Sequence, residues 1–299
     1  MNIVIFGAGA IGSLFGALLS KNNNVSLIGR KPHVNAIKKS GLKIRGITKL
    51  DVAIHATCSV NKVNSSPDFL ILTVKSYDTD NAIKQAGNII GENTTVLSLQ
   101  NGLDNVDSIK KYLEPEKIIA GVTTYGALFS EPGEIRHTGM GTTVIGELNG
   151  KKTERIDNIV RLFNQAGIKT TASPDITKDI WGKAVVNSCI NPLTTFFQCK
   201  NGYLLDNPIL GQLVEKICQE STYIANAQGL DFSYEDVIKN TKNVIRNTSE
   251  NYSSMFQSYR MGKKIEIDSI NGKLVEVGTK KGVDVSLNEM LVYLIKGRK

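Results

Sequence analysis

The feature that most constrains the fold is a glycine-rich turn placed directly after a short apolar segment. Residues 2–6, NIVIF, are apolar and rich in β-branched side chains, as in a buried strand. Residues 7–12, GAGAIG, follow them, and residues 10–20 have the composition of a helix. A second apolar run at residues 25–28 completes the order strand, turn, helix, strand. This order predicts a βαβ unit, in which the two strands are parallel and the crossover is right-handed.

The alternation of strand-like and helix-like segments continues beyond this unit. Predicted helices occupy residues 78–86 and 103–112. The further predicted strands are residues 69–74, 94–99, 118–122, 133–137 and 142–146, the last two as hairpin strands around turn glycines. Because strands and helices alternate, we expect an α/β fold with a Rossmann-type doubly wound, mainly parallel sheet that is covered on both faces.

Near residue 175 the pattern changes to helical periods with almost no strand signal. We therefore expect two closely packed domains, because no linker rich in Gly and Ser separates the two patterns. The first is a Rossmann domain at residues 1–170, and the second is an all-helical domain at residues 171–299.

Three local signals describe helix ends in the second domain. Ser173 followed by Pro174 is typical of a helix start, with Ser as the cap. Pro192 is expected to bend or end this helix, because proline lacks a backbone N–H. Ser286 and Glu289 have the spacing of a capping box at the start of the last helix.

The net charge of +8 does not indicate a polyanionic partner, because Lys and Arg are scattered as short pairs. No run reaches the length of a nucleic-acid-binding or localisation segment, so we interpret the pairs as solvated surface. The uncharged stretch at residues 3–20 lacks a preceding basic segment and a small-residue cleavage site, which argues against a signal peptide or membrane helix. We expect a cytoplasmic monomer or homodimer with no nucleic-acid or membrane partner.

The cysteine pattern argues against a metal site and against a disulfide framework. None of the 4 cysteines forms a C-x-x-C pair, and only 3 histidines are available as further metal ligands. In a chain of 299 residues, a core can be built without disulfides. The sequence predicts buried free thiols in a reducing compartment and no metal.

In its context the G-x-G-x-x-G turn indicates a dinucleotide. The first glycine makes the tight turn, the second lets the backbone approach a pyrophosphate, and the third lets helix and strand pack closely. The N–H groups at the helix start then meet the phosphate charge. The alternative is a turn without a ligand. The cofactor-binding residues predicted here are Gly7, Ala8, Gly9, Ala10, Ile11 and Gly12.

The residue after the second strand selects the nucleotide. An NAD site usually has Asp or Glu at this position, which binds the ribose 2′-hydroxyl. This chain has Arg30 followed by Lys31. A cation suits a 2′-phosphate, so we predict NADP(H); the alternative is a pair of surface charges.

Five polar residues are candidates for the chemistry. Lys75 and Asn101 follow two predicted strands, at the sheet edge where α/β proteins bind ligands. Lys183, Asn187 and Asn191 are spaced four apart on one helix face. Taken singly, each has an ordinary interpretation: a solvated loop lysine, a turn asparagine and a solvent-facing polar stripe.

Together these segments resemble the ketopantoate reductase (2-dehydropantoate 2-reductase) family. The resemblance runs from residue 1 to beyond 290, in order and with compatible spacing. The segments that carry it are residues 5–12 (IFGAGAIG), 73–76 (TVKS), 99–102 (LQNG), 181–195 (WGKAVVNSCINPLTT), 201–202 (NG), 253–257 (SSMFQ) and 266–272 (EIDSING).

The resemblance implies a role for each matching position. Lys183 would be the acid that polarises or protonates a ketone oxygen, and Glu266 would orient it through hydrogen bonds. Asn101 and Lys75 would lie between the nicotinamide and the substrate, Lys75 as a cofactor-binding residue and Asn101 as a residue that binds both, and Arg30 would lie at the 2′-phosphate. The remaining substrate-binding positions would be Asn187, Asn191, Asn201 and, for the carboxylate, Ser254.

The implied function is NADPH-dependent reduction of 2-dehydropantoate to pantoate, a step towards coenzyme A. Hydride addition to a ketone builds negative charge on oxygen, and a preorganised ammonium group stabilises that charge and can deliver a proton. Two alternatives remain at this point: reduction of another small 2-keto acid, and a dinucleotide-binding sensor that does no chemistry.

Overall fold

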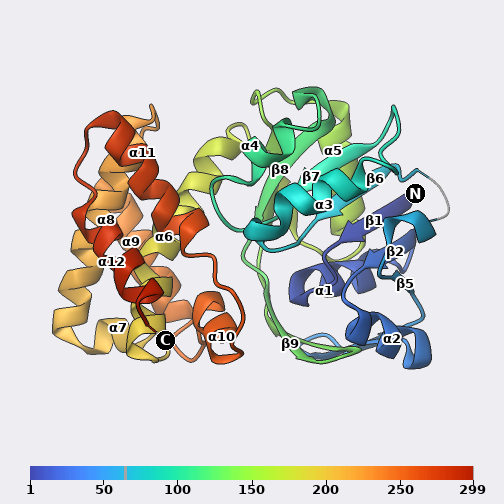
Figure 1. Cartoon of the computed structure of the whole chain (residues 1–299), viewed down its shortest axis with the longest axis horizontal. Coiled ribbons are helices and arrows are strands. Elements are labelled where there is room, and N and C mark those ends of the chain that lie inside the picture. Colours follow the sequence, from blue (N-terminus) through green and yellow to red (C-terminus); the bar gives the residue numbers. More distant parts are fainter. Residues whose placement is uncertain (64–65, 299) are drawn as a thin grey trace. The chain divides into compact units, whose positions relative to one another are not determined.

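The computed structural model describes residues 1–63 and 66–298, and the chain divides into two compact units (Figure 1). The sheet unit consists of Met1–Gln100 and Asn105–Asp179. The helical unit consists of the short segment Asn101–Asp104 and the chain from Ile180 onward. The division expected from sequence, at 170/171, differs in two ways. The long helix begins in the sheet unit, and four residues after a sheet strand belong to the helical unit.

The sheet unit is built on an eight-stranded sheet of order β12-β11-β8-β7-β6-β1-β2-β5. Its strands are β1 (Asn2–Phe6), β2 (Asn24–Ile28), β5 (His55–Thr57), β6 (Phe69–Leu72), β7 (Thr95–Ser98), β8 (Ile118–Thr123), β11 (Thr143–Glu147) and β12 (Thr170–Ala172). All neighbours pair in parallel except β11 and β8, which are antiparallel. The predicted α/β class and mainly parallel sheet are confirmed.

Alternate residues of β1 explain why both faces of this sheet are covered. Side chains along a strand point alternately to opposite faces. Ile3 and Ile5 belong to one core cluster, together with Phe15 of α1, whereas Val4 belongs to a second cluster, together with Ile83 of α3. The helices of the unit are α1 (Ala10–Leu19), α2 (Lys31–Ser40), α3 (Thr79–Ala86), α4 (Asn105–Lys110), α5 (Glu154–Gln165) and the short η1 (Val60–Lys62), η2 (Ser76–Asp78) and η3 (Pro115–Lys117).

A second sheet of order β4-β3-β10-β9 was not predicted from sequence. Its strands are β3 (Leu42–Gly46), β4 (Leu50–Val52), β9 (Gly126–Glu131) and β10 (Glu134–Gly139). The predicted hairpin of residues 133–137 with 142–146 is wrong, because β10 pairs with β9 and β11 pairs with β8. The turn glycine of the true hairpin is Gly133, with φ of +86°. Gly141 serves close packing instead, since a Cβ there would lie 2.3 Å from Tyr125 N.

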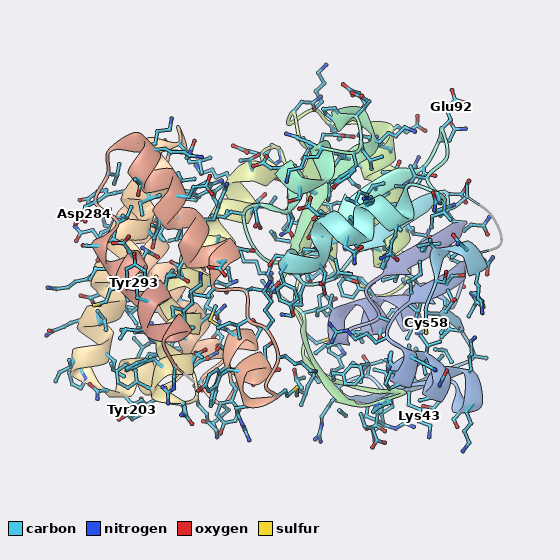
Figure 2. The ribbon with its side chains drawn as sticks, viewed as in Figure 1. Lys43, Cys58, Glu92, Tyr203, Asp284 and Tyr293 are labelled. Carbon is cyan, nitrogen blue, oxygen red and sulfur yellow. The ribbon has the colours of Figure 1, made fainter. Side chains whose placement is uncertain are left out.

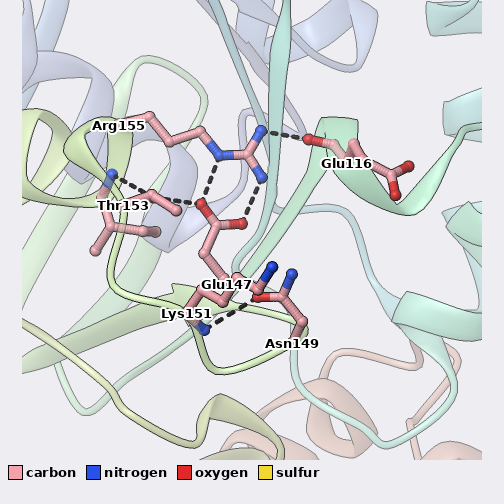
Figure 3. Close-up of polar contacts among 7 residues, drawn as sticks. Glu116, Glu147, Asn149, Lys151, Thr153 and Arg155 are labelled. Carbon is pink, nitrogen blue, oxygen red and sulfur yellow. Dashed lines mark hydrogen bonds and ion pairs between the residues drawn. The ribbon is translucent and has the colours of Figure 1, made fainter.

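A buried carboxylate at the end of β11 anchors the first turn of α5 (Figure 3). Arg155 donates two hydrogen bonds to Glu147, and Thr153 donates another at 2.5 Å. Arg155 also donates to the backbone oxygen of Glu116. Burial of Glu147 opposes its ionisation, but these hydrogen bonds outweigh burial and lower its pKa below the ordinary value. These hydrogen bonds hold the start of α5 against the end of β11 within the sheet unit.

Every regular element of the helical unit, within the part of the chain that is described, is a helix, which confirms the predicted all-helical C-terminal part. Residues of α6 and α8 dominate its core, among them Val185, Cys189, Ile217 and Cys218. The helices are α6 (Ile176–Phe197), α7 (Tyr203–Asp206), α8 (Pro208–Ala227), α9 (Tyr234–Asn247), α10 (Ser254–Arg260), η4 (Asp268–Gly272), α11 (Lys273–Lys281) and α12 (Ser286–Lys296).

Helix α6 differs from its sequence-based description at both predicted ends. It begins at Ile176 rather than after Ser173, and the Asp175 carboxylate accepts from Lys178 N at 3.0 Å in its first turn. It also continues through Pro192 to Phe197, so of the two expectations for Pro192 the helix end is wrong. Pro192 is buried and has no N–H to donate to Ser188 O, and this oxygen accepts from Asn271 Nδ2 at 3.1 Å instead.

The predicted capping box at the start of α12 is wrong as well. Ser286 is the first helical residue, and its N-cap Val285 makes no side-chain capping bond. Asp284 Oδ1 accepts from Ser286 N at 3.0 Å, but Ser286 itself caps nothing. The turn is capped instead from α8, where Glu220 accepts hydrogen bonds from Leu287 N and Asn288 N, both at 2.8 Å. The chain therefore satisfies these helix-end donors with a carboxylate remote in sequence.

The four cysteines are free thiols, but only two are buried. Cys189 and Cys218 lie in the core of the helical unit, whereas Cys199 is half-buried. Cys58 is exposed on the sheet unit, where Figure 2 labels it. The expectation of buried thiols is therefore wrong for Cys58.

Candidate active site

The glycine turn joins β1 to α1, and its backbone leaves no room for side chains at two of its three glycines. Gly7 has φ of +120°, and a Cβ there would lie 2.5 Å from Val74 N. A Cβ on Gly12 would lie 2.2 Å from Gly7 O and 2.4 Å from Thr73 Oγ1. Thr73 Oγ1 in turn donates to Gly7 O at 2.8 Å. These two glycines are needed by the packing of strand and helix, as the motif predicts.

Gly9 is different, because nothing inside the protein requires a glycine there. A Cβ at Gly9 would meet only Gly7 O, at the ordinary contact distance of 3.9 Å. Gly9 is the N-cap of α1, and no side chain in the described residues caps this helix. The first N–H groups of a helix lack intrahelical partners and favour anions. The turn therefore fits a dinucleotide, with Gly9 giving the pyrophosphate access to the backbone.

Two further cofactor candidates lie in the sheet unit with the glycine turn. Arg30 is the N-cap of α2, directly after β2, and its side chain is 78% exposed. Its guanidinium lies 3.8 Å from the Asp78 carboxylate, an exposed ion pair of small energetic value. Lys75 is half-buried and directly precedes η2, near the end of β6.

The helical unit brings the predicted acid into contact with a predicted binding residue. Lys183 Nζ donates a hydrogen bond to Asn101 Oδ1 at 2.7 Å. These residues are 82 positions apart in sequence, and they meet because Asn101–Asp104 packs within the helical unit. A neutral amide oxygen accepts this hydrogen bond without placing an opposite charge beside the ammonium group.

A closed series of hydrogen bonds fixes this pair. Leu103 N donates to Ser269 O at 2.9 Å, and Ser269 Oγ donates to Asp104 Oδ2 at 3.1 Å. Both contacts attach the segment of Asn101 to η4. Asn271, also in η4, donates to Ser188 O of α6 at 3.1 Å. The series thus returns to the helix that carries Lys183, and it holds the ammonium group and the amide in a set geometry.

Burial makes the carboxyl group in this series unusual. The pKa of Asp104 is raised chiefly by burial, and the negative charge of Glu266 raises it further, although the Ser269 hydrogen bond opposes the shift. Glu266 is 6% exposed and lies just before η4. The same helical unit contains Glu266 and the segment that carries Asn101.

The other predicted substrate residues occupy the same unit at different positions. Asn187 is half-buried and Asn191 buried, one and two turns after Lys183 on α6. Asn201 lies after α6, where its Nδ2 donates to Thr248 Oγ1 at 2.9 Å. The Asn201 Oδ1 atom is buried and has no hydrogen-bond partner among the described residues.

Ser254 is the first residue of α10 and is exposed. Its neighbour Ser253 is the residue that caps this helix, since Ser253 Oγ accepts from Phe256 N at 3.2 Å. The Ser254 side chain is therefore not used as a helix cap.

Neither a metal-binding cluster nor a membrane-spanning helix is present among the described residues. No group of three or more His, Cys, Asp or Glu side chains among them is arranged to hold a metal ion. No helix in residues 1–63 and 66–298 combines the length and apolar character required to cross a bilayer.

Sequence reasoning missed Asp104, Ser269 and Asn271, which connect the Lys183–Asn101 pair to the rest of the helical unit. Ser269 and Asn271 lie within the segment 266–272 that resembles the reductase family, but a serine and an asparagine there have no periodic signal of their own. Only the fold shows that both are buried beside α6 and the Asn101 segment.

Comparison with known proteins gives one consistent family. The family model described as Ketopantoate reductase PanE/ApbA matches residues 3–150, and the model of its C-terminal part matches residues 175–299. The 2-dehydropantoate 2-reductase of Pyrococcus abyssi is 42% identical over 301 residues, covering 100% of this chain and 98% of that protein. The enzyme of the same name from Archaeoglobus fulgidus is 34% identical, covering 99% and 97%.

Solved structures show the same architecture. The 2-dehydropantoate 2-reductase from Geobacter metallireducens superposes with a TM-score of 0.95 at 28% identity, covering 100% of both chains. D-mandelate dehydrogenase with NADH and anilino(oxo)acetate superposes with a TM-score of 0.94 at 27% identity, covering 99% of this chain and 98% of that one. On the matches of both its parts, the chain belongs to the ketopantoate reductase family.

Proposed function

We propose that this protein reduces 2-dehydropantoate to pantoate with NADPH. The observation that carries the proposal is the hydrogen bond from Lys183 to Asn101, held by a closed series of contacts in the helical unit. A sensor would not need an ammonium group fixed in this way. The names of relatives that match over the whole chain support the same reaction.

The proposed cofactor site is in the sheet unit. Gly7, Ala8, Gly9, Ala10, Ile11 and Gly12 would hold the pyrophosphate on the glycine turn. Arg30, exposed at the start of α2, would bind the 2′-phosphate and so favour NADPH over NADH. Lys75 would contact the nicotinamide end, and Asn101, which belongs to the helical unit, is proposed as a further cofactor-binding residue. When bound, the nicotinamide supplies the hydride that the ketone accepts.

Lys183 is proposed as the general acid. Its ammonium group donates a hydrogen bond to the ketone oxygen and delivers a proton as negative charge develops there. Asn101 accepts from the same Nζ, so it orients the remaining N–H bonds of Lys183. Glu266, buried in the same helical unit as the Asn101 segment, is proposed to orient the lysine site through hydrogen bonds.

Neutral asparagines and a serine are proposed to hold the substrate. Asn187 and Asn191, on the Lys183 face of α6, would hold the substrate and its hydroxyl groups, and Ser254 would bind the carboxylate. Asn201 offers a buried acceptor without a protein partner, which suits a substrate hydroxyl group. Such paired polar groups reject an analogue that lacks the hydroxyl, because a buried acceptor is then left unpaired.

The test is the fall in NADPH absorbance at 340 nm with 2-dehydropantoate, compared with simpler 2-keto acids. We expect 2-dehydropantoate to give the highest kcat/KM. Replacing Lys183 by Ala should lower kcat about a hundredfold or more while NADPH binding survives, because only the proton donor is lost. Lys216→Ala, at an exposed lysine of α8, is the matched control and should leave kcat unchanged.

Two results would refute the proposal. Unimpaired turnover by Lys183→Ala would exclude Lys183 as the acid. A wild-type protein that binds NADPH but consumes none with any keto acid would favour a sensor instead.

A second candidate function is reduction of an aryl 2-keto acid with NADH. It is supported by the close structural similarity to D-mandelate dehydrogenase, which was solved with NADH and anilino(oxo)acetate. An aryl keto acid in the same panel, assayed with both dinucleotides, separates the two candidates. Higher kcat/KM for the aryl acid with NADH would replace the first proposal by the second.

We further propose a cytoplasmic role in the synthesis of pantothenate and coenzyme A. Supply of pantoate to growing cells tests this role: cells that depend on the protein should lose the dependence when pantoate is added. Continued dependence would contradict the proposed place in metabolism.

A further inference from the structure

A buried histidine joins the two segments that are proposed to bind the dinucleotide. His33 lies in the first turn of α2, three residues after Arg30, and is 3% exposed. Its Nε2 is 3.0 Å from Ser13 Oγ, in the helix that follows the glycine turn. Its Nδ1 accepts a hydrogen bond from Gly133 N at 2.9 Å. His33 therefore connects α1, α2 and the β9–β10 turn.

The hydrogen bonds of this histidine fix its tautomer. A backbone N–H can only donate, so Nδ1 must be the unprotonated nitrogen and Nε2 must carry the hydrogen that is donated to Ser13. Burial lowers the pKa of His33, which agrees with a neutral ring that uses one nitrogen as donor and one as acceptor. The Phe129 ring packs against it, with ring centroids 4.8 Å apart.

The position of Arg30 depends on how α2 is held. No side chain in the described residues caps α2, and its start follows β2 by two residues only. Gly29 packs on the glycine turn, since a Cβ there would lie 2.7 Å from Ala8 Cβ. On the other side, Gly133 packs against Ala36 of α2, since a Cβ on Gly133 would lie 3.1 Å from Ala36 Cβ. His33 is the polar side chain between these two packing points.

We propose that His33 is a positioning residue that sets the preference for NADPH over NADH by holding Arg30 relative to the glycine turn. This inference rests on the cofactor preference proposed above. The pyrophosphate, common to both dinucleotides, binds to the turn, whereas the 2′-phosphate of NADPH alone reaches Arg30. Loosening α2 from α1 therefore costs NADPH affinity and leaves NADH affinity nearly unchanged.

The test measures the Kd of NADPH and of NADH by fluorescence titration without any keto acid. His33→Asn keeps an acceptor for Gly133 N but is too short to reach Ser13, and Ser13→Ala removes the same contact from the other side. Each variant should weaken NADPH binding about three- to tenfold, the value of one hydrogen bond, with a much smaller change for NADH. In an Arg30→Ala background, His33→Asn should no longer change the ratio of the two Kd values.

A second histidine–serine pair provides the matched control. His55 Nδ1 of β5 lies 3.1 Å from Ser26 Oγ of β2 in an exposed contact of the same unit, and His55→Asn should leave the ratio of Kd values unchanged. Equal changes for both dinucleotides in His33→Asn and Ser13→Ala would reduce His33 to a merely structural residue and overturn the inference. A wild-type protein that does not prefer NADPH overturns it together with the cofactor proposal, but leaves the reductase activity to be decided by the keto-acid assay.

Discussion

The cap that α8 provides for α12 allows a quantitative prediction. Glu220 accepts three hydrogen bonds at 2.8 Å, from Leu287 N, Asn288 N and Asn288 Nδ2. In Glu220→Gln one oxygen becomes an NH₂ group, so one charge-assisted bond is replaced by two facing donors. The lost bond is worth about 1.5–3 kcal/mol. Loss of negative charge at the helix N-terminus adds about 0.3–1 kcal/mol. We expect the free energy of unfolding to fall by about 2–4 kcal/mol.

The single tryptophan allows the loss of stability in Glu220→Gln to be measured in the helical unit. Trp181 packs against two core clusters of the helical unit, so its fluorescence reports unfolding of that unit during urea denaturation. For an m value of about 1–3 kcal/mol/M, the urea midpoint should fall by about 1 M or more. Glu289→Gln, which removes a second carboxylate from the same helical turn, is the control and should cost less than about 1 kcal/mol.

The reasoning is refuted if Glu220→Gln has the midpoint of the wild type. It is also refuted if Glu220→Gln and Glu289→Gln lower the midpoint equally, because the effect would then be one of helix charge and not of the hydrogen bonds to Leu287 and Asn288.

Two further predictions concern the sheet unit. Gly9→Ala should leave the urea midpoint unchanged, since its Cβ would meet only Gly7 O at 3.9 Å, but it should weaken NADPH binding in a titration. Gly12→Ala should lower both the urea midpoint and the affinity for NADPH, since its Cβ would lie 2.2 Å from the same oxygen. The pKa values of His33 and His137 are lowered by burial, so these side chains take up protons at a higher pH in the unfolded chain, near pH 6.5, than in the folded chain. Their contribution to the stability of the unit is therefore complete above about pH 6.5 and declines as pH falls. A urea midpoint that rises as the pH is lowered from about 7.5 to about 6 would contradict this.

The sheet unit was predictable where local pattern and topology agree. The segment from β1 to β2 follows from β-branched runs, a glycine turn and a helical period, and each of these signals lies within a few residues. The second sheet was missed because β3 and β4 are short and mixed in polarity, for example Leu42–Gly46 with two cations. The pairing of β3 with β10 depends on contacts about 90 residues away in sequence, which no local pattern expresses, and β4 joins the sheet only through β3.

For the candidate site, sequence identified the residue types but not their connections. The four-residue spacing of Lys183, Asn187 and Asn191 placed them on one helix face, and the helix confirms this face. The partner of Lys183 was not predictable from spacing. Asn101 is 82 positions away and belongs to the helical unit only as part of the four-residue segment Asn101–Asp104. Burial of Glu266 is likewise a property of the packed unit alone.

Pro192 explains how α6 can both continue and take part in the site. A proline at this position has no N–H to donate to the carbonyl oxygen of Ser188, four residues earlier. That oxygen instead accepts from Asn271 Nδ2 at 3.1 Å, and Asn271 lies in η4, which also holds the Asn101 segment through Ser269. Pro192, which the sequence suggested would bend or end the helix, therefore leaves Ser188 O free of a helical partner, and the bond from Asn271 to this oxygen closes the series of contacts around Lys183. A missing hydrogen bond within one helix becomes a tertiary hydrogen bond, and the helix loses none of its length.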